Sequence, residues 1–208
     1  YGATPVEWLF NNHEVNNRWC LIHSTHLTDI ETRSIAKSKA IVGLCPITES
    51  SLGDGTFNGI IFSKEKGSYG FGTDSNIQID LRAEMRTFEY SQRLKHKARA
   101  VLATETKSTG RILHEQANKS SATALGRNSG KIAIGYLADI AELPLGNPDL
   151  EGLKNDMALD AWIFSPDSTS VENLWSAGRH IVKSRSHINK EIITKKYMKV
   201  IKKLRSDL

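Results

Sequence analysis

Three apolar stretches of the sequence are each followed directly by side chains that could do chemistry. The polar segments occupy positions 23–26 (HSTH), 45–49 (CPITE) and 73–76 (TDSN). In parallel α/β folds the loops after the strands converge on one face, so functional residues gather at the carboxyl ends of strands. If the three stretches are neighbouring strands, His23 and Asp74 meet on that face. A His and an Asp brought together there suit a divalent metal, most readily zinc, or an acid/base pair.

Each of these two residues also has a purely structural interpretation. An Asp after a strand commonly caps the next helix, and for Asp74 alone the two interpretations carry equal weight. A single His is more often a hydrogen-bonded core residue than a ligand, and this applies to His23 alone. Their joint occurrence on one predicted face favours the functional interpretation for both.

The other polar residues near this face are given structural roles. Ser75 and Asn76 could position Asp74, but capping of the next helix is the better interpretation. His26 is expected at the surface or as a cap. Glu49 either lines the site or begins a solvent-exposed loop, and the loop is slightly favoured. Five histidines without a polar partner at ligand spacing are interpreted as structural: His13, His96, His114, His180 and His187.

The elements that must position these residues alternate between short apolar strands and helices. Residues 4–12 suit a helix with a proline in its first turn, and Thr28-x-x-Glu31 has the spacing of a capping box that opens a second helix. Longer helices are predicted from near Asp80 and from Ser108. Buried strands are predicted at 18–23, 40–45 and 69–73, the first of them buried on both faces. Strand, polar loop and helix in repetition predict an α/β fold with a parallel sheet or barrel.

The pattern changes near residue 126, where short strand candidates separated by Gly, Asn, Pro and Ser begin. They predict a small antiparallel β unit, and the chain therefore divides into segments 1–126 and 127–208. The candidate strands are 131–135 (KIAIG), 138–143 (ADIAEL), 160–165 (DAWIFS), 173–178 (NLWSAG) and 180–184 (HIVKS).

The last twenty residues hold the whole net charge of +5, because seven Lys or Arg face two acids within 189–208. Apolar side chains recur there at helical spacing, which predicts an amphipathic helix docked by its apolar face with the lysines in solvent. We therefore expect no nucleic-acid and no membrane partner for this segment. The apolar positions are Ile193, Tyr197, Val200, Ile201 and Leu204.

Composition places the chain among ordinary globular proteins, with 208 residues, 39% hydrophobic and 25% charged. No apolar run approaches the roughly 18 residues that span a bilayer, and the first residues lack the pattern of a signal peptide. Cys20 and Cys45 both lie in apolar stretches, which favours reduced, buried thiols over a disulfide. A soluble, cytoplasmic protein is the resulting expectation.

Several longer motifs resemble the carboxyl-terminal half of the amidohydrolase superfamily over nearly the whole chain. ALGR followed by GKIAIG and ADIA is shared by many members, whereas CPITESSLGDG and EYSQRL are narrower. The resemblance is strongest to the formimidoylglutamate deiminases. Guanine deaminases and their relatives tend to show Ser-Asn where this chain has Thr48-Glu49, and this difference points to the deiminases.

The resemblance implies that 1–126 holds strands six to eight of a (β/α)8 TIM-type barrel and that 127–208 forms a flanking β-sandwich segment with the terminal helix. It implies Zn2+ as cofactor, with Asp74 as a metal ligand and proton shuttle and His23 hydrogen-bonded to the attacking hydroxyl. The other ligands and a glutamate proton donor are expected upstream of Tyr1, so this chain alone is expected to be incomplete.

The implied reaction is hydrolytic deimination of N-formimidoyl-L-glutamate to N-formyl-L-glutamate and ammonia, in histidine degradation. The expected partner is this small-molecule substrate, and a homodimer is allowed. Two other interpretations stay open. A guanine or other purine aminohydrolase shares the barrel and the His/Asp pair, and a non-catalytic fragment would also carry only part of the site.

Overall fold

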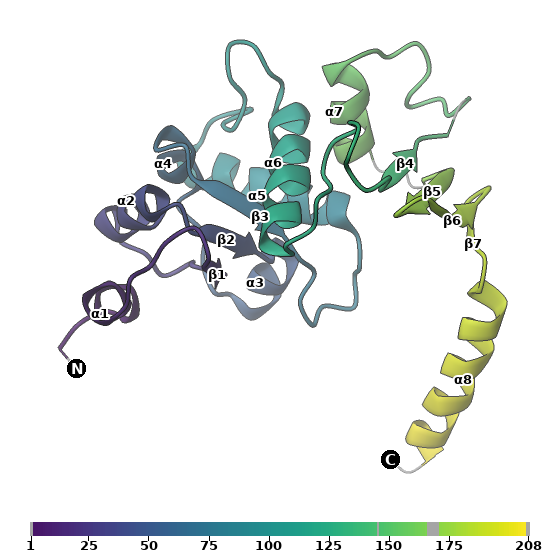
Figure 1. The fold of residues 1–208 in the computed structure, drawn as a ribbon, viewed down its shortest axis with the longest axis horizontal. Helices are drawn as coiled ribbons and strands as arrows, with labels where there is room; N and C mark the ends of the chain where they lie inside the picture. The colour runs from purple at the N-terminus through teal and green to yellow at the C-terminus, as the bar shows by residue number, and fades with distance from the viewer. Residues whose placement is uncertain (1, 145, 166–170, 207–208) are drawn as a thin grey trace.

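A three-stranded parallel sheet forms the centre of the first part of the chain (Figure 1). The computed structural model describes residues 2–144, 146–165 and 171–206. The sheet has the order β1-β2-β3 and aligns Leu21 with Val42 and Val42 with Tyr69. The strands are β1 (Cys20–Ile22), β2 (Ile41–Leu44) and β3 (Ser68–Phe71). The predicted alternation of parallel strands and helices, and hence the α/β class, is confirmed.

Side-chain caps fix the starts of the four helices that the sequence predicts before residue 126. Thr4 and Thr28 each form a complete capping box, with Glu7 and Glu31 respectively. The backbone N–H of Arg82 donates to Asp80, and that of Arg111 donates to Ser108. The helices are α1 (Pro5–Asn12), α2 (Asp29–Ser38), α5 (Leu81–His96) and α6 (Thr109–Ala124).

Two short helices occupy the segment between β2 and β3, for which the sequence predicts no helix. They are α3 (Pro46–Leu52) and α4 (Gly59–Lys64). Pro46 follows β2 directly and stands at the first position of helix α3. The backbone N–H that proline lacks would have no partner within the helix at that position. Neither helix is long enough to show a clear apolar periodicity. The segment after β2 is therefore helical, and α3 carries Glu49.

The core lies between the sheet and the helices and is rich in aromatic rings. Tyr69 packs edge-on against Phe71 and Phe88, and Phe57 packs edge-on against Phe62. Other fully buried members come from every layer, namely Ile35, Val42, Leu44, Met85 and Leu113. Close contact between β3 and α6 depends on Gly70, where a Cβ would lie 2.6 Å from the Ser121 Oγ atom.

The expectation that β1 is buried on both faces is wrong. Ile22 is 55% exposed and Cys20 is exposed, whereas Cys45 is buried as predicted. The reason is position, because β1 pairs only with β2 and forms an edge of the three-stranded sheet. A strand with an apolar face but no outer neighbour leaves that face to solvent.

The second sheet is antiparallel with the order β4-β5-β6-β7. It confirms the predicted strands at 138–143, 173–178 and 180–184. The segment 131–135 is not a strand, and 160–165 falls largely within helix α7 (Asp156–Phe164). The strands are β4 (Ile140–Glu142), β5 (Asn173–Ser176), β6 (Arg179–Lys183) and β7 (Ser186–His187).

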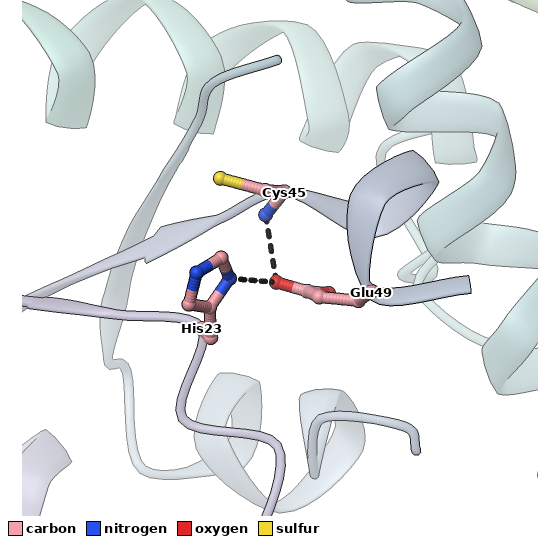
Figure 2. A group of neighbouring side chains, drawn as sticks. All are labelled: His23, Cys45 and Glu49. Carbon is pink, nitrogen blue, oxygen red and sulfur yellow. Dashed lines mark hydrogen bonds and ion pairs between the residues drawn. The ribbon is translucent and has the colours of Figure 1, made fainter. Parts of the chain in front are cut away.

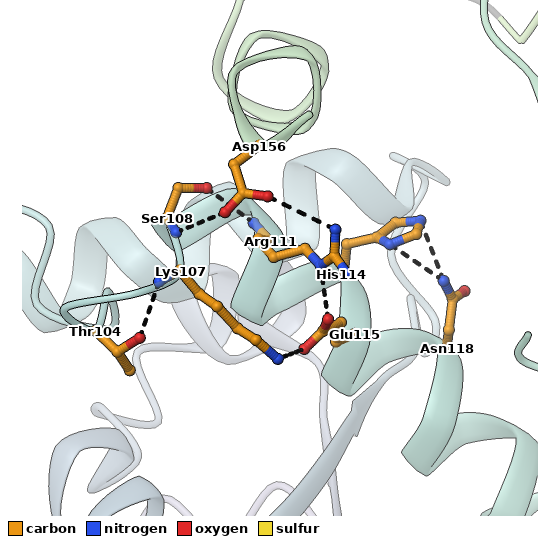
Figure 3. A network of polar contacts seen from close by, with 8 residues as sticks. All are labelled: Thr104, Lys107, Ser108, Arg111, His114, Glu115, Asn118 and Asp156. Carbon is orange, nitrogen blue, oxygen red and sulfur yellow. Dashed lines mark hydrogen bonds and ion pairs between the residues drawn. The ribbon is translucent and has the colours of Figure 1, made fainter. Parts of the chain in front are cut away.

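Helix α7 packs onto the first part of the chain, although the predicted boundary at 126 places it in the second. Its Ile163 is fully buried in the main core. Asp156 accepts a hydrogen bond from the Ser108 N–H at 3.1 Å and lies 3.6 Å from Arg111 Nη1, at the start of α6 (Figure 3). A short apolar run such as DAWIF is ambiguous between strand and helix, and these contacts hold the helical form in place. The domain boundary itself stays a prediction.

The basic terminal helix α8 (Lys190–Ser206) forms as predicted, but it does not dock onto the residues described. It projects away from both sheets (Figure 1). Tyr197 is 62% exposed, and Ile193, Val200 and Leu204 are each more than half exposed. The prediction of a docked helix is therefore wrong within this part of the chain, because no described residue of α8 is buried. Among the described residues, no helix is long and apolar enough to cross a membrane.

Candidate active site

The structure brings His23 and Asp74 together at the carboxyl end of the parallel sheet. His23 directly follows β1, and Asp74 lies in the loop after β3. The His23 Nε2 atom is 3.6 Å from Asp74 Oδ2, and the two side chains are 36% and 37% exposed. Both groups can therefore reach solvent and a small molecule. The contact that strand ends predict from sequence is present.

His23 and Asp74 both have an unusual backbone conformation, which sets the direction of their side chains. The φ angles of His23, Ser24 and Asp74 are 65°, 54° and 50°, in the left-handed region that L residues rarely adopt. The His23 N–H extends the sheet ladder by donating to the Gly43 carbonyl at 2.8 Å. Such positions cluster at functional sites, where the surrounding structure holds them.

The loop after β3 does not cap the next helix. Helix α5 begins at Leu81, and Asp80 is its cap, accepting from the Arg82 N–H at 2.9 Å. The expected capping by Ser75 or Asn76 is therefore wrong, because several residues separate them from the helix. Instead the Asp74 Oδ1 atom accepts from the Ser75 N–H at 2.7 Å.

Glu49 and Asp74 lie on opposite sides of the His23 ring. Figure 2 shows the contact between Glu49 and His23. Its Oε1 atom accepts the Cys45 N–H at 2.7 Å and lies 3.2 Å from His23 Nδ1. The residue is 5% exposed, so the expectation of a solvent loop is wrong. Burial raises the pKa of Glu49, and the hydrogen bonds from Cys45 and His23 offset part of that rise. Helix α3 turns Glu49 inward.

A second buried carboxylate, Glu84 of α5, lies beneath this face and has no sequence signal that marks it. Its Oε2 atom accepts the Ile47 N–H at 2.9 Å, while its Oε1 atom has no hydrogen-bond partner within the described residues. Burial raises the pKa of Glu84 to about 7. Burial, and then the charges of Glu49, Asp74 and Glu84, raise the pKa of the Cys45 thiol to about 11.

Replacing Glu84 by Gln is expected to stabilise the protein at pH 8 and to change little at pH 5. Because folding raises the pKa of this carboxyl from 4.5 to about 7, the protonated form is the one that the fold favours. The stabilisation of the fold by protonated Glu84 is complete below the unfolded-state pKa and is lost as the pH rises through the folded-state pKa. The loss in the free energy of unfolding is on the order of 3 kcal/mol. Urea denaturation midpoints at the two pH values measure this. Identical pH dependence in the wild type and the variant would contradict it.

His23, Cys45 and Glu49 form a compact group in which one potential ligand atom of each lies within 4.8 Å of the others (Figure 2). The group is nevertheless engaged in hydrogen bonds, because Glu49 Oε1 already contacts the Cys45 N–H and His23. A thiol must be deprotonated to bind a metal, and the raised pKa of Cys45 opposes this. Glu49 therefore serves as a hydrogen-bond acceptor in this arrangement.

Asp74 and His23 offer the donors that suit zinc, a carboxylate oxygen and an imidazole nitrogen. Both are partly exposed at the same edge. Catalytic zinc sites generally use three protein ligands and an open position. The described residues thus fit one part of such a centre. His26 is exposed, as expected. Two other histidines have structural contacts: His114 packs edge-on against Trp162 and lies near Asn118, and His180 stacks on Trp175.

Ionisable groups at the carboxyl end of a helix-flanked parallel sheet are typical of the active sites of α/β enzymes. The family model of the amidohydrolases matches residues 3–181. This chain belongs to the amidohydrolase family.

Two curated relatives are similar to nearly the whole of this chain. Formimidoylglutamate deiminase of Pseudomonas aeruginosa is 35% identical over 204 residues, which are 98% of this chain and 45% of the relative. The 5-methylthioadenosine/S-adenosylhomocysteine deaminase of Pyrococcus furiosus is 30% identical over 207 residues, 97% of this chain and 47% of that protein. The chain thus spans about half the length of the relatives it matches.

Solved structures agree on the fold. An amidohydrolase from Brucella melitensis superimposes with a TM-score of 0.91 and 42% identity, covering 98% of this chain and 45% of that one. An adenosine deaminase from Xanthomonas campestris, solved with bound zinc, superimposes with a TM-score of 0.86. Its 22% identity, over 99% of this chain and 47% of that one, supports the fold alone.

Proposed function

We propose that this chain supplies the carboxyl-terminal half of a zinc-dependent deiminase that hydrolyses N-formimidoyl-L-glutamate to N-formyl-L-glutamate and ammonia. The observation that carries the proposal is the His23–Asp74 pair, 3.6 Å apart at the carboxyl end of the sheet. The 35% identity to the Pseudomonas deiminase over nearly the whole chain supports this choice of substrate.

The proposal includes a (β/α)8 barrel, in which β1, β2 and β3 are strands six, seven and eight. Their parallel order and the TM-score of 0.91 to the Brucella amidohydrolase support it. The exposed outer edge of β1 would then pair with the fifth strand, and the antiparallel sheet with α8 would belong to a flanking sandwich. Residues upstream would supply the other strands, the remaining zinc ligands and a glutamate proton donor.

Asp74 would be one of the zinc ligands and the proton-transfer group of the reaction. A bound zinc ion would lower the pKa of water from about 15.7 toward 7 and so provide a nucleophile at neutral pH. The Asp74 carboxylate takes the proton of the attacking water and passes it to the departing nitrogen. Water adds to the formimidoyl carbon, the carbon–nitrogen bond to the terminal nitrogen breaks, and ammonia leaves with the transferred protons.

His23 would stabilise the oxygen that attacks the formimidoyl carbon. Its Nε2 atom faces the space beside Asp74, and its ring is about one-third exposed. The Nε2 atom of an imidazole held there can accept a hydrogen bond from the attacking water and from the hydroxyl group of the tetrahedral intermediate that follows. Preorganised contacts of this kind contribute about 3 kcal/mol in comparable sites.

A purine-type deaminase is the second candidate, because the Pyrococcus deaminase is 30% identical over 97% of this chain. The same pair could attack an aromatic C–NH2 group, since both reactions add water to a carbon–nitrogen double bond and release ammonia. The Thr48-Glu49 dipeptide, where the guanine deaminases tend to carry Ser-Asn, favours the formimidoyl substrate.

Ammonia release by the full-length protein that carries these residues separates the two candidates. With N-formimidoyl-L-glutamate, we expect one ammonia and one N-formyl-L-glutamate for each substrate consumed. With 5′-methylthioadenosine, adenosine and guanine, we expect kcat/KM to be at least about 10³-fold lower, because a site built for polar groups rejects substrates that leave them unpaired. A higher kcat/KM for any of the purine compounds would contradict the proposed substrate.

A further inference from the structure

We propose that Glu49 is a positioning residue that fixes the ring orientation and tautomer of His23. This inference deepens the proposed function and rests on it for the role of His23. Its basis is a line of three side chains, with the His23 ring between two carboxylates. Glu49 Oε1 lies 3.2 Å from Nδ1, and Asp74 Oδ2 lies 3.6 Å from Nε2.

The Glu49 carboxylate is itself held in place before it contacts His23. Its Oε1 atom accepts the Cys45 N–H at 2.7 Å, at the junction of β2 and α3. Helix α3 is tied in turn to the loop of Asp74, because the Thr48 hydroxyl donates to the Thr73 carbonyl at 3.2 Å. The Glu49 carboxylate is therefore a buried hydrogen-bond acceptor whose position is fixed relative to the ends of β2 and β3.

A fixed acceptor at Nδ1 determines where the ring proton lies. A neutral imidazole carries one N–H, and an ionised carboxylate can only accept. Glu49 Oε1 is within hydrogen-bond distance of Nδ1, whereas Asp74 Oδ2 is 3.6 Å from Nε2 and beyond it. Contact with Glu49 thus places the proton on Nδ1 and leaves Nε2 able to accept a hydrogen bond from the attacking water. Carboxylates that hold the second nitrogen of a functional His in this way set its tautomer and orientation in other enzymes.

Loss of this contact should lower turnover more than it weakens substrate binding. The Glu49→Gln variant keeps the size of the side chain but replaces the charged acceptor at Nδ1 by a neutral amide oxygen, which weakens the preference for a proton on Nδ1. The Glu49→Ala variant removes the acceptor and frees the ring. For both we expect kcat to fall by about 10- to 100-fold with KM within about threefold and zinc content unchanged.

Glu84→Gln is the matched control in the full-length protein. Glu84 is also a buried carboxylate that accepts a backbone N–H of helix α3, but its partner is Ile47. We expect this variant to keep kcat within about twofold of the wild type. An equal loss of kcat in Glu84→Gln would mean that both variants only disturb packing, and would overturn the positioning role.

Histidine-selective 15N NMR at pH 8.5 observes the tautomer directly, with His23 assigned by the signal missing from His23→Gln. The expected result is a protonated Nδ1 in the wild type and in Glu84→Gln, and a smaller fraction of this tautomer in both Glu49 variants. An unprotonated Nδ1 in the wild type, or zinc loss in Glu49→Gln, would overturn the proposal. If the wild type shows this tautomer but no activity toward N-formimidoyl-L-glutamate, the proposed substrate fails while the positioning of His23 stands.

Discussion

Asp74→Asn is expected to lower kcat for ammonia release by about 10³- to 10⁴-fold and to weaken zinc binding in the full-length protein. The substitution keeps the shape of the side chain but removes both the negative charge and the capacity to take a proton. The Asp74 side chain has no role as a helix cap that its loss would disturb, because Asp80 caps α5. Steady-state kinetics and zinc content by elemental analysis measure the two effects.

Asp80→Asn provides the control for this experiment. It is the same chemical change in the same segment between β3 and α5, and Asn caps a helix about as well as Asp. Its only described ion-pair partner is Arg82, at 2.9 Å. We expect near-normal kcat and zinc content. Turnover by Asp74→Asn within tenfold of the wild type would show that Asp74 is neither the ligand nor the base.

His23→Ala has the second largest expected effect, a fall in kcat of about 10²- to 10³-fold with zinc retained. The difference from Asp74→Asn follows from the proposed roles, because His23 stabilises the reacting oxygen whereas Asp74 holds the metal. Kinetics combined with zinc analysis on the same preparations separates the two roles.

His26→Ala is the matched control, since His26 follows the same strand but is exposed. It should behave as the wild type in both measurements. Loss of zinc in His23→Ala would make His23 a ligand and would contradict the role given to it here.

The helices with strong local signals could be predicted from sequence because short-range chemistry fixes their ends. The Thr28 side chain accepts a hydrogen bond from the Glu31 N–H, and the Glu31 side chain accepts one from the Thr28 N–H. Because the two residues are only three positions apart, this pattern can be recognised in the sequence. Helices α3 and α4 lack such signals. Neither Cys45 nor Asn58, which precede them, makes a side-chain capping bond, so their starts depend on the surrounding packing.

Burial was harder to predict than secondary structure. Apolar side chains predict an apolar partner surface but do not specify where it lies. Ile22 at the sheet edge and Tyr197 on α8 are both more than half exposed, although their patterns predict burial. In α7, by contrast, the ambiguous run around Ile163 becomes a helix because that side chain fills the core beside α5 and α6.

The approach of His23 to Asp74 could be predicted because strand ends in a parallel sheet meet at one edge. The sequence left the place of Glu49 open between the site and a solvent loop, and it gave no signal for Glu84, which lies beneath the site. The burial of each depends on a backbone N–H at the start of α3 that only the folded chain supplies. Cys45 and Glu49 are four residues apart, a spacing that becomes informative once α3 is known to be a helix.

Anomalous X-ray scattering at the zinc edge, from crystals of the full-length protein grown with zinc, tests the central claim most directly. The account predicts one strong zinc peak within bonding distance of the Asp74 carboxylate, with His23 beside it and Glu49 still hydrogen-bonded to His23 Nδ1. A zinc ion held by His23, Cys45 and Glu49, or no zinc at Asp74, would contradict the account.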